Sequence, residues 1–338
     1  MANAEVLKSA RDVNLEQAIV IDSTLIKTFR ACPQKYQYFN IQHYVPKSRK
    51  SAPSFGIAMH EGIATFRNMR MKGMKYPEAV EIGQAALQKA YTEHMPLEAQ
   101  SEVMQDDRRS ITNAIRIYHG FCQHFEPCGY TYKHIEVPFA LWLGTVTVAQ
   151  LDIGGRTEGY HTKDVIYTGI IDAVLDFGGL TYVTDIKTTG MNITESYLDG
   201  FKMDQGLPGY LLAARELLGV TTNHAIVHAM WVQKEAKTAR GKPLDEYFHT
   251  KPLYWDDDQL REWQSNTLKT IEDIETAKVS GRWVMDFGAS SCNSFGVGCD
   301  YRAVCSLTPT ARPQRLEMDY RKALWTPLED ERLQPLED

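Results

Sequence analysis

Hydrophobic residues recur with two different periods along the chain, and the change of period divides the sequence. Up to about residue 125, apolar residues follow the three- and four-residue spacing of amphipathic helices. The predicted helices cover residues 23–32, 54–71, 77–93 and 101–125. Ser23 is the expected N-cap of the first, and Pro33 is expected to end it. This part of the sequence therefore predicts a helical block.

Beyond this block the pattern is that of strands. Apolar and β-branched residues predict strands at 130–143, 165–177, 180–188 and 224–233, with helices at 207–220 and at about 256–279. The expected fold class is α/β, with a mixed central sheet flanked by helices and a cysteine-containing element near the C-terminus. We expect one domain, residues 1–305, in which 20–130 form the helical block, 131–235 the core sheet and 236–305 a helix with the cysteine element. The Pro-rich, charged tail, 306–338, is predicted to be partly disordered.

Composition is that of a globular protein, with 43% hydrophobic and 24% charged residues. No stretch approaches the run of about 18 apolar residues that crosses a membrane. The first twenty residues mix acids and bases around no apolar core, so we do not expect a signal peptide. These features predict a cytoplasmic protein whose cysteines stay reduced.

The net charge of −6 argues against a generally basic nucleic-acid-binding surface, but one stretch is locally basic. Between Pro46 and Lys75 there are seven bases and the single acid Glu61. Such bases could contact DNA phosphates, although a solvated helix face is the commoner meaning. The tentative DNA-binding residues are Lys47, Arg49, Lys50, Arg67 and Arg70.

The stretch from 169 to 190 predicts a tight hairpin with chemistry on one face. Gly178 and Gly179 can supply the positive φ angles of a two-residue turn. With that turn, Asp172 faces Asp185 across the two strands, and Lys187 projects from the same face. Opposed side chains of this kind have Cβ atoms about 5 Å apart. The hairpin therefore predicts two carboxylates and an ammonium in one patch.

Two carboxylates so close repel each other, and a divalent cation relieves the repulsion. Lys187 could then orient or deprotonate a water, or stabilise a negatively charged transition state. The alternative is an exposed face on which Lys187 simply pairs with one aspartate. Opposed aspartates on strands otherwise rich in Ile, Val and Leu favour a site.

The order Asp172, then Asp185-Ile186-Lys187 on the next strand, resembles the core motif of the PD-(D/E)XK nucleases. Three further stretches resemble its RecB-like branch, which includes CRISPR-associated and phage exonucleases: "CPQKYQYFNI" from Cys32, "FGIAMHEGIATF" around His60 and "QGLPGYLLAA" from Gln205. The similarity runs from about Ser23 to Cys305. It implies a restriction-endonuclease-like fold.

The resemblance also implies roles for individual residues. It implies a Mg²⁺ or Mn²⁺ site formed by His60, Asp172, Asp185 and the carbonyl of Ile186, with Lys187 as a catalytic residue. Gln205 and Tyr210 match a glutamine and a tyrosine of the family's downstream helix and are expected at the catalytic site. For Tyr210 the resemblance implies a contact with DNA phosphate or support of the site, and the alternative is a tyrosine that packs on the sheet. Glu136 resembles the glutamate before the core strands, which implies that it lines the site, and an exposed strand glutamate explains it nearly as well.

Three cysteines lie close together near the end of the chain, Cys292, Cys299 and Cys305. With a fourth thiolate they could hold either Zn²⁺ or a [4Fe–4S] cluster. The resemblance implies that Cys32 is the fourth ligand and that the group is an iron–sulfur cluster with a structural role. The remaining cysteines, Cys122 and Cys128, are expected to be core or half-buried thiols.

The expected function is a metal-dependent DNA nuclease, more specifically an exonuclease on single-stranded or unwound ends. Recombination, repair, phage replication and CRISPR adaptation are the expected settings, with a helicase, recombinase or adaptation protein as partner. One alternative is a nonenzymatic nucleic-acid-binding or assembly protein stapled by its cysteine site. Another is an electron-transfer iron–sulfur protein, which predicts a reversible redox couple and no DNA turnover.

Overall fold

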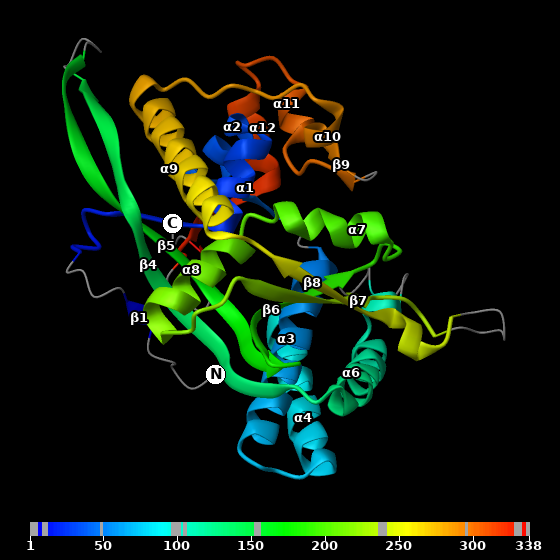
Figure 1. Cartoon of the computed structure of the whole chain (residues 1–338). Helices are drawn as coiled ribbons and strands as arrows, with labels where there is room; N and C mark the ends of the chain where they lie inside the picture. Colours follow the sequence, from blue (N-terminus) through cyan, green and yellow to red (C-terminus); the bar gives the residue numbers. More distant parts are fainter. Residues whose placement is uncertain are drawn as a thin grey trace. The chain divides into compact units, whose positions relative to one another are not determined.

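The structure is a computed structural model that describes residues 6–8, 13–47, 50–95, 103, 107–151, 157–235, 242–294, 297–327 and 333–335 (Figure 1). The chain divides into two compact units. The first unit comprises residues 1–6, 48–138 and 170–257, and the second unit comprises 7–47, 139–169 and 258–338. The two long strands β4 (Thr131–Leu151) and β5 (Thr157–Phe177) each contribute residues to both units.

In the described residues, the first unit contains three long helices, several shorter helices and all or part of five sheet strands. Its helices are α3 (Ser51–Met71), α4 (Tyr76–His94), η2 (Asp107–Arg109), α6 (Ile111–Phe125), η3 (Glu126–Cys128), α7 (Glu195–Asp199), η4 (Gly200–Met203), α8 (Leu207–Leu218) and η5 (Leu244–Tyr247). Its strands, besides the first residues of β4 and the last of β5, are β6 (Leu180–Thr189), β7 (His224–Trp231) and β8 (Phe248–Tyr254).

The strands of the first unit follow the order β4-β5-β6-β7-β8. β5 and β6 are antiparallel, β6 and β7 are parallel, and β7 and β8 are antiparallel. The turn between β5 and β6 is Gly178-Gly179, with φ angles of 57° and 81°. Phe177 pairs with Leu180 and Val174 with Val183, so the predicted hairpin register is confirmed.

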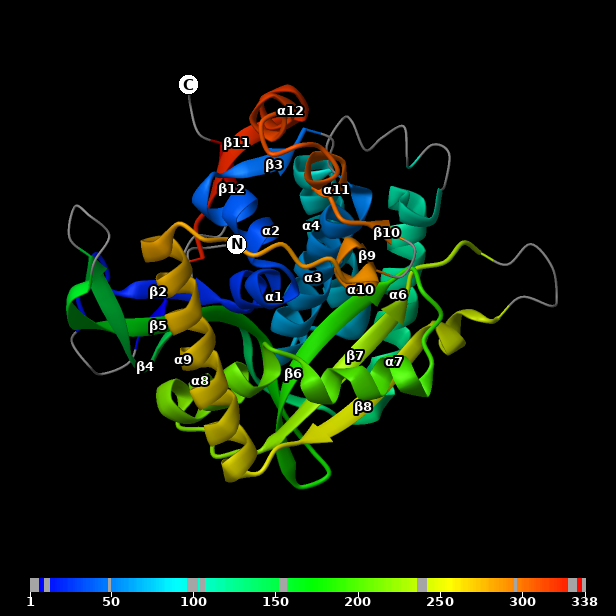
Figure 2. The same cartoon turned by 90° about the horizontal axis from the view of Figure 1, so that it is seen from above.

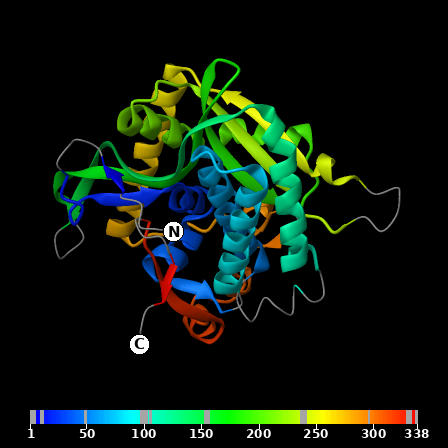
Figure 3. The same cartoon turned by 90° about the horizontal axis from the view of Figure 1, so that it is seen from below.

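Helices cover both faces of this sheet, as Figures 2 and 3 show for α3, α4 and α6 on one face and α7 and α8 on the other. Met230 of β7 belongs to the apolar core that α3, α4 and α6 form against the sheet. Its neighbour Ala229 packs instead with Ile193 and Leu198, beside α7. Successive residues of a strand point to opposite faces, so both faces are buried, which explains the nearly unbroken apolar run of β7.

The second unit surrounds the other ends of β4 and β5. Its further strands are β1 (Leu7–Lys8), β2 (Ile19–Asp22), β3 (Tyr44–Pro46), β9 (Asn293–Ser294), β10 (Val297–Gly298), β11 (Tyr320–Trp325) and β12 (Leu333–Pro335). Its helices are α1 (Ser23–Ala31), α2 (Pro33–Tyr36), η1 (Gln37–Ile41), α9 (Asp257–Ser280), α10 (Ala289–Cys292), α11 (Arg302–Cys305) and α12 (Arg312–Asp319). Within it, β2 runs parallel to β5, and the α9 residue Gln264 donates a 2.6 Å hydrogen bond to the carbonyl of Leu143 on β4.

Most predicted elements and the mixed α/β class are confirmed. The N-cap of α1 is wrong by one residue, because Asp22, not Ser23, accepts the 2.9 Å hydrogen bond from the backbone N–H of Leu25. The pattern did not predict β8 or the shorter strands β1, β2, β3 and β9–β12. In the described residues, the predicted tail contains α12, β11 and β12, and residues 328–332 and 336–338 lie outside the described residues. No helix in the described part of the chain is long and apolar enough to span a membrane.

Candidate active site

The hairpin of β5 and β6 places its acidic residues inside the first unit rather than on its surface. Asp172 is 7% exposed and Asp185 is 4% exposed. The backbone N–H of Ile186 donates a 2.6 Å hydrogen bond to Oδ2 of Asp172, so the two strands carry the carboxylates side by side. Burial excludes the alternative of an exposed, solvated acidic face.

Helix α3 brings His60 to the same place. Its Nε2 lies 3.1 Å from the carbonyl oxygen of Ile186, and its Nδ1 lies 3.6 Å from Oδ2 of Asp172. Gly56, one turn earlier, lies against β6, where an added Cβ would stand 3.4 Å from Oγ1 of Thr188. A Cβ at this position would therefore make an ordinary van der Waals contact with β6, and the four-residue spacing places Gly56 and His60 on the same face of α3.

Glu136 of β4 completes this group. In the described residues, His60, Glu136 and Asp172 are the one set of three or more potential ligands whose donor atoms all lie within 4.8 Å of one another. Glu136 has a φ of 48°, an angle that few non-glycine residues adopt and that costs roughly 1–3 kcal/mol. Glu136 thus has both a strained backbone within β4 and a carboxylate that lies next to His60 and Asp172.

Lys187 lies beside Asp185. Its Nζ is 2.9 Å from Oδ1 and 2.7 Å from Oδ2 of Asp185. Oδ2 is nevertheless a buried oxygen that accepts no hydrogen bond of good geometry. The ion pair therefore leaves part of this carboxylate available to another ligand.

Burial and the crowding of like charges shift the pKa values of the residues at this site. Burial is the main cause that raises the pKa of Asp185 to about 6; Lys187 opposes this shift and Asp172 contributes to it. Burial also raises the pKa of Glu136, with Asp172 adding to the effect. Burial disfavours the charged form of Lys187, but Asp185 and Asp172 outweigh it and raise the pKa of Lys187 above its ordinary value.

This donor set fits a divalent cation. Carboxylate oxygens, a backbone carbonyl and one imidazole converge, and the acids lack enough positive charge around them to offset their repulsion. Mg²⁺ and Mn²⁺ prefer oxygen ligands, and imidazole is compatible with Mn²⁺. The sequence indicated Glu136 as a residue lining the site but did not include it among the metal ligands; its signal was the resemblance of the stretch around it to the glutamate before the core strands.

The loop before α8 borders the same residues. Asp204 accepts hydrogen bonds from the backbone N–H groups of Gly206, at 2.6 Å, and Leu207, at 3.3 Å, and so stabilises the start of α8. Its carboxylate also contributes to the raised pKa of Lys187. Gln205 is 6% exposed, whereas Tyr210 is half-buried on α8. Their predicted roles at the site remain predictions.

The predicted DNA-binding bases differ widely in exposure. Arg67 is 1% exposed, so it cannot contact DNA and its prediction is wrong. Arg70 is half-buried and forms a 2.5 Å ion pair with Glu126. Lys47 is exposed and donates to the carbonyl of Met318, Lys50 is exposed, and Arg49 lies outside the described residues.

The four predicted cluster cysteines lie together in the second unit. Cys32 Sγ accepts a 3.5 Å hydrogen bond from the backbone N–H of Asp286, and Cys292 Sγ donates one of 3.5 Å to the carbonyl of the same residue. Burial raises the pKa of Cys305 to about 11, and Cys299, Cys32 and Cys292 each add to the effect. These cysteines are free thiols.

The two remaining cysteines belong to the first unit. Cys122 is fully buried in its apolar core, and the half-buried Cys128 packs against that core. The prediction of core and half-buried thiols is confirmed.

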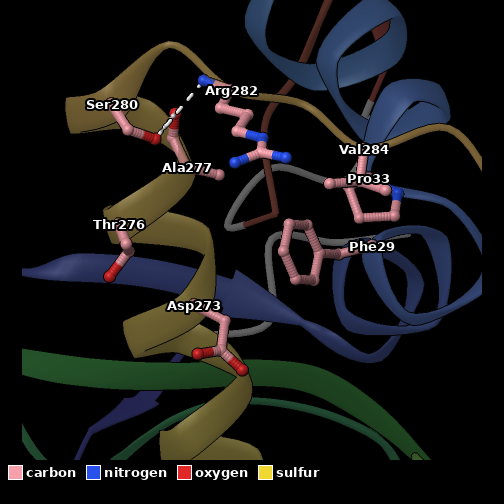
Figure 4. Close-up of a pocket in the computed structure, with 8 residues that line it drawn as sticks. All are labelled: Phe29, Pro33, Asp273, Thr276, Ala277, Ser280, Arg282 and Val284. Atoms are coloured by element: carbon pink, nitrogen blue, oxygen red, sulfur yellow. Dashed lines mark hydrogen bonds between the residues drawn. The ribbon is translucent and has the colours of Figure 1, made fainter.

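A shallow hollow of about 300 Å³ lies in the second unit between α1, α2 and α9 (Figure 4). Its lining residues are Phe29, Pro33, Asp273, Thr276, Ala277, Ser280, Arg282 and Val284. One acid and one base among mostly apolar groups do not form a metal site.

Comparison with known proteins identifies the family of the chain. The chain matches the family model of the PD-(D/E)XK nuclease superfamily over residues 23–306. The crystal structure of SSO0001 is similar at 13% identity and a TM-score of 0.29, over 88% of this chain and 89% of that one. Another similar structure is a protein of Eubacterium rectale with a provisional assignment as an exonuclease, at 9% identity and a TM-score of 0.39, over 88% of this chain and 95% of that one. No curated protein matches. Because the family model covers most of the chain, the chain belongs to the PD-(D/E)XK nuclease superfamily.

Proposed function

We propose that this protein is a divalent-metal-dependent DNA exonuclease of the RecB-like branch, acting on single-stranded or unwound ends. The observation that carries the proposal is the convergence of His60, Glu136 and Asp172, next to the Asp185–Lys187 pair. Membership of the nuclease superfamily supports phosphodiester hydrolysis as the reaction. The order of the sequence motifs supports the RecB-like branch.

His60, Asp172, Asp185 and the carbonyl of Ile186 are the predicted metal ligands, and the position of Glu136 adds it as a candidate. Mg²⁺ or Mn²⁺, when bound, would polarise the phosphate and lower the pKa of a water molecule. Asp172 keeps one hydrogen bond from the backbone N–H of Ile186, which fixes the orientation of its carboxylate relative to β6.

Lys187 would act as an ammonium group. Asp185 and Asp172 favour its charged form, so stabilisation of negative charge on the phosphate fits better than proton removal from water. A preorganised cation in a partly buried site is effective because little solvent screens it. Of the three roles that the sequence left open for Lys187, we therefore favour charge stabilisation and orientation of water over deprotonation of water.

We propose that Cys32, Cys292, Cys299 and Cys305 hold a structural [4Fe–4S] cluster in the second unit. The four cysteines lie near one another, since Cys299, Cys32 and Cys292 all act electrostatically on Cys305. Four thiolates suit either Zn²⁺ or a [4Fe–4S] cluster, and the resemblance of the early single cysteine and the late trio to iron–sulfur nucleases supports the cluster.

We propose that the protein acts in the cytoplasm of a bacterium or of a phage-infected cell, because a cysteine-bound cluster needs thiols that stay reduced. An exonuclease that needs unwound ends acts with a protein that unwinds or pairs DNA, so we propose a helicase, a recombinase or a CRISPR adaptation protein as partner.

End-labelled DNA with one end blocked tests the activity. Purified protein is incubated with single-stranded and duplex DNA, free or blocked at the 5′ or the 3′ end, in Mg²⁺, Mn²⁺ or EDTA. We expect degradation of single strands with either metal, none with EDTA, and loss of cleavage when one particular end is blocked. DNA blocked at both ends is included as a further substrate, and its cleavage at the same rate as free DNA would contradict an exonuclease. No cleavage under any condition would indicate a nonenzymatic DNA-binding protein.

A further inference from the structure

Lys187 leaves the sheet of the first unit on the side that α7 covers. Lys187 of β6 pairs in register with Ala229 of β7. Side chains at paired positions of neighbouring strands point to the same face of a sheet, so Lys187 and Ala229 share one face. Ala229 packs on this face with Ile193 and Leu198, beside α7 (Figure 2). The residues of α7 and of the helix after it are therefore neighbours of the proposed catalytic lysine.

Two aromatic rings pack on the same face. Tyr197 of α7 and Phe201 of η4 pack against the buried cluster that contains Ala229. Their ring centroids lie 5.2 Å apart with an interplanar angle of 89°, which is a favourable edge-to-face contact. Because Ala229 is the register partner of Lys187, this aromatic pair lies beside the strand position that carries the lysine.

The surroundings of the Tyr197 hydroxyl agree with this placement. Burial is the main cause that raises the pKa of Tyr197, whereas a hydrogen bond with Thr189 and the charge of Lys187 lower it. Thr189 and Lys187 are alternate residues of β6, so both point to the face that α7 covers. The hydroxyl of Tyr197 is thus held against the strand that carries Lys187.

The aromatic pair is not fully covered by protein. Tyr197 and Phe201 are both half-buried. Apolar side chains on either side of them in the sequence are exposed: Met191, just after β6, by 40%, and Met203, at the end of η4, by 87%. Half-buried rings together with exposed apolar side chains indicate a surface that a further apolar or aromatic group can cover.

The acidic residues of α7 point away from these rings. Nζ of Lys251 on β8 lies 3.3 Å from Oε2 of Glu195 and 2.7 Å from Oδ1 of Asp199. Tyr197 lies midway between these two acids in the sequence, and two helical residues correspond to a rotation of about 200°. Its ring therefore leaves α7 on the side opposite to the carboxylates, so these carboxylates do not oppose the approach of a phosphate to the rings.

We propose that Tyr197 and Phe201 form a stacking platform for one base of single-stranded DNA, beside the phosphate that Lys187 stabilises. Aromatic side chains stack with any base, because every base has a π-face, so such a platform is tolerant of sequence. A base can reach the platform only when it is unpaired, and the platform thus favours single-stranded or unwound ends. This inference rests on the proposed function and deepens it, because it assigns residues to the recognition of the substrate.

Oligonucleotides that lack bases test the platform. Single-stranded DNA is compared with DNA of the same length in which the nucleotides at the 5′ or the 3′ end are abasic, and kcat/KM of the full chain is measured in Mn²⁺. We expect kcat/KM of the wild type to be about 10-fold higher for the DNA with all its bases, which is within the range for one stacked base. Equal values for all substrates would overturn the proposal.

Leucine variants assign the effect to the two rings. Tyr197→Leu and Phe201→Leu remove the ring and keep an apolar side chain, so we expect each to lose most of the preference for DNA with bases. Tyr197→Phe keeps the ring and is expected to retain the preference. Variants that are folded by circular dichroism and keep the full preference, or that lose kcat/KM equally on all substrates, would contradict the platform. If one leucine variant does not fold, the other decides.

Phe177→Leu is the matched control. Phe177 is a 42% exposed aromatic residue of the first unit, and its ring centroid lies 5.1 Å from that of Tyr130. It is five residues from Asp172 on β5, about 17 Å along the strand, and so lies away from the acidic cluster. We expect Phe177→Leu to keep the wild-type preference, and its loss in this variant would argue against a specific role of Tyr197 and Phe201.

Binding without turnover separates this inference from the proposed function. Fluorescence anisotropy in EDTA measures the affinity of the wild type and of Tyr197→Leu for the same oligonucleotides. We expect the wild type to bind DNA with bases more tightly than abasic DNA and Tyr197→Leu to bind both similarly. This binding preference without any cleavage would refute the proposed function alone, whereas cleavage that does not depend on the bases would refute only this inference.

Discussion

Lys187→Met is expected to lower the rate of DNA cleavage by about 10²- to 10³-fold, the cost of removing one preorganised charge-stabilising group. Lys187 Nζ lies 2.7 Å from a carboxylate oxygen of Asp185, at the acidic cluster of the first unit. Methionine keeps the length of the side chain and removes its charge. Single-turnover cleavage of end-labelled DNA measures the effect, and circular dichroism establishes that the variant is folded.

Lys133→Met is the matched control for this change. Lys133 is also a strand lysine of the first unit, and its Nζ lies 2.9 Å from Oδ1 of Asp176 on β5. This pair is largely exposed, so its loss costs little stability and should leave the cleavage rate unchanged. Wild-type cleavage by Lys187→Met would refute the role that we assign to this lysine.

Cys305→Ser is expected to release the iron and to destabilise the second unit. Cys305 packs against an apolar cluster that contains Tyr38 and Tyr301, so it links the cysteines to the core of this unit. A cluster that joins residue 32 to residues 292–305 closes a very long loop, an effect on the order of 4 kcal/mol. We therefore expect the thermal midpoint to fall by about 10 °C.

Iron, sulfide and zinc analysis, together with thermal unfolding, measures this prediction. Cys128→Ser is the control, because Cys128 is a half-buried thiol of the first unit and is expected to leave the iron content unchanged. One equivalent of zinc with no iron in the wild type would contradict the iron–sulfur cluster. An unchanged thermal midpoint in metal-free Cys305→Ser would contradict a structural role.

Local features of the hairpin were predictable from the sequence. Two adjacent glycines specify a turn with positive φ angles, and the two-residue period of a strand then fixes which residues face each other. Burial of Asp172 and Asp185 followed from the apolar residues around them. The N-cap of α1 was missed by one residue because Asp22 and Ser23 are both good caps, and only the backbone angles distinguish them.

Long-range features were not predictable from local pattern alone. His60 contacts the carbonyl of Ile186, which is 126 positions later in the sequence, and only the family resemblance could predict this contact. The φ of Glu136 depends on its packing and has no sequence signal, because glutamate is ordinary in a strand. Arg67 could have been recognised as buried, since it lies four residues after Ile63 and therefore on the apolar stripe of α3.

The central claim is that the buried acids of the β5–β6 hairpin bind a divalent metal on which DNA cleavage depends. Calorimetric titration of Mn²⁺ and cleavage of single-stranded DNA, measured on the same preparations of wild type and Asp185→Asn, tests it most directly. We predict that the wild type binds Mn²⁺ and degrades DNA and that folded Asp185→Asn does neither. Cleavage by Asp185→Asn at the wild-type rate, or by the wild type in EDTA, would contradict the claim.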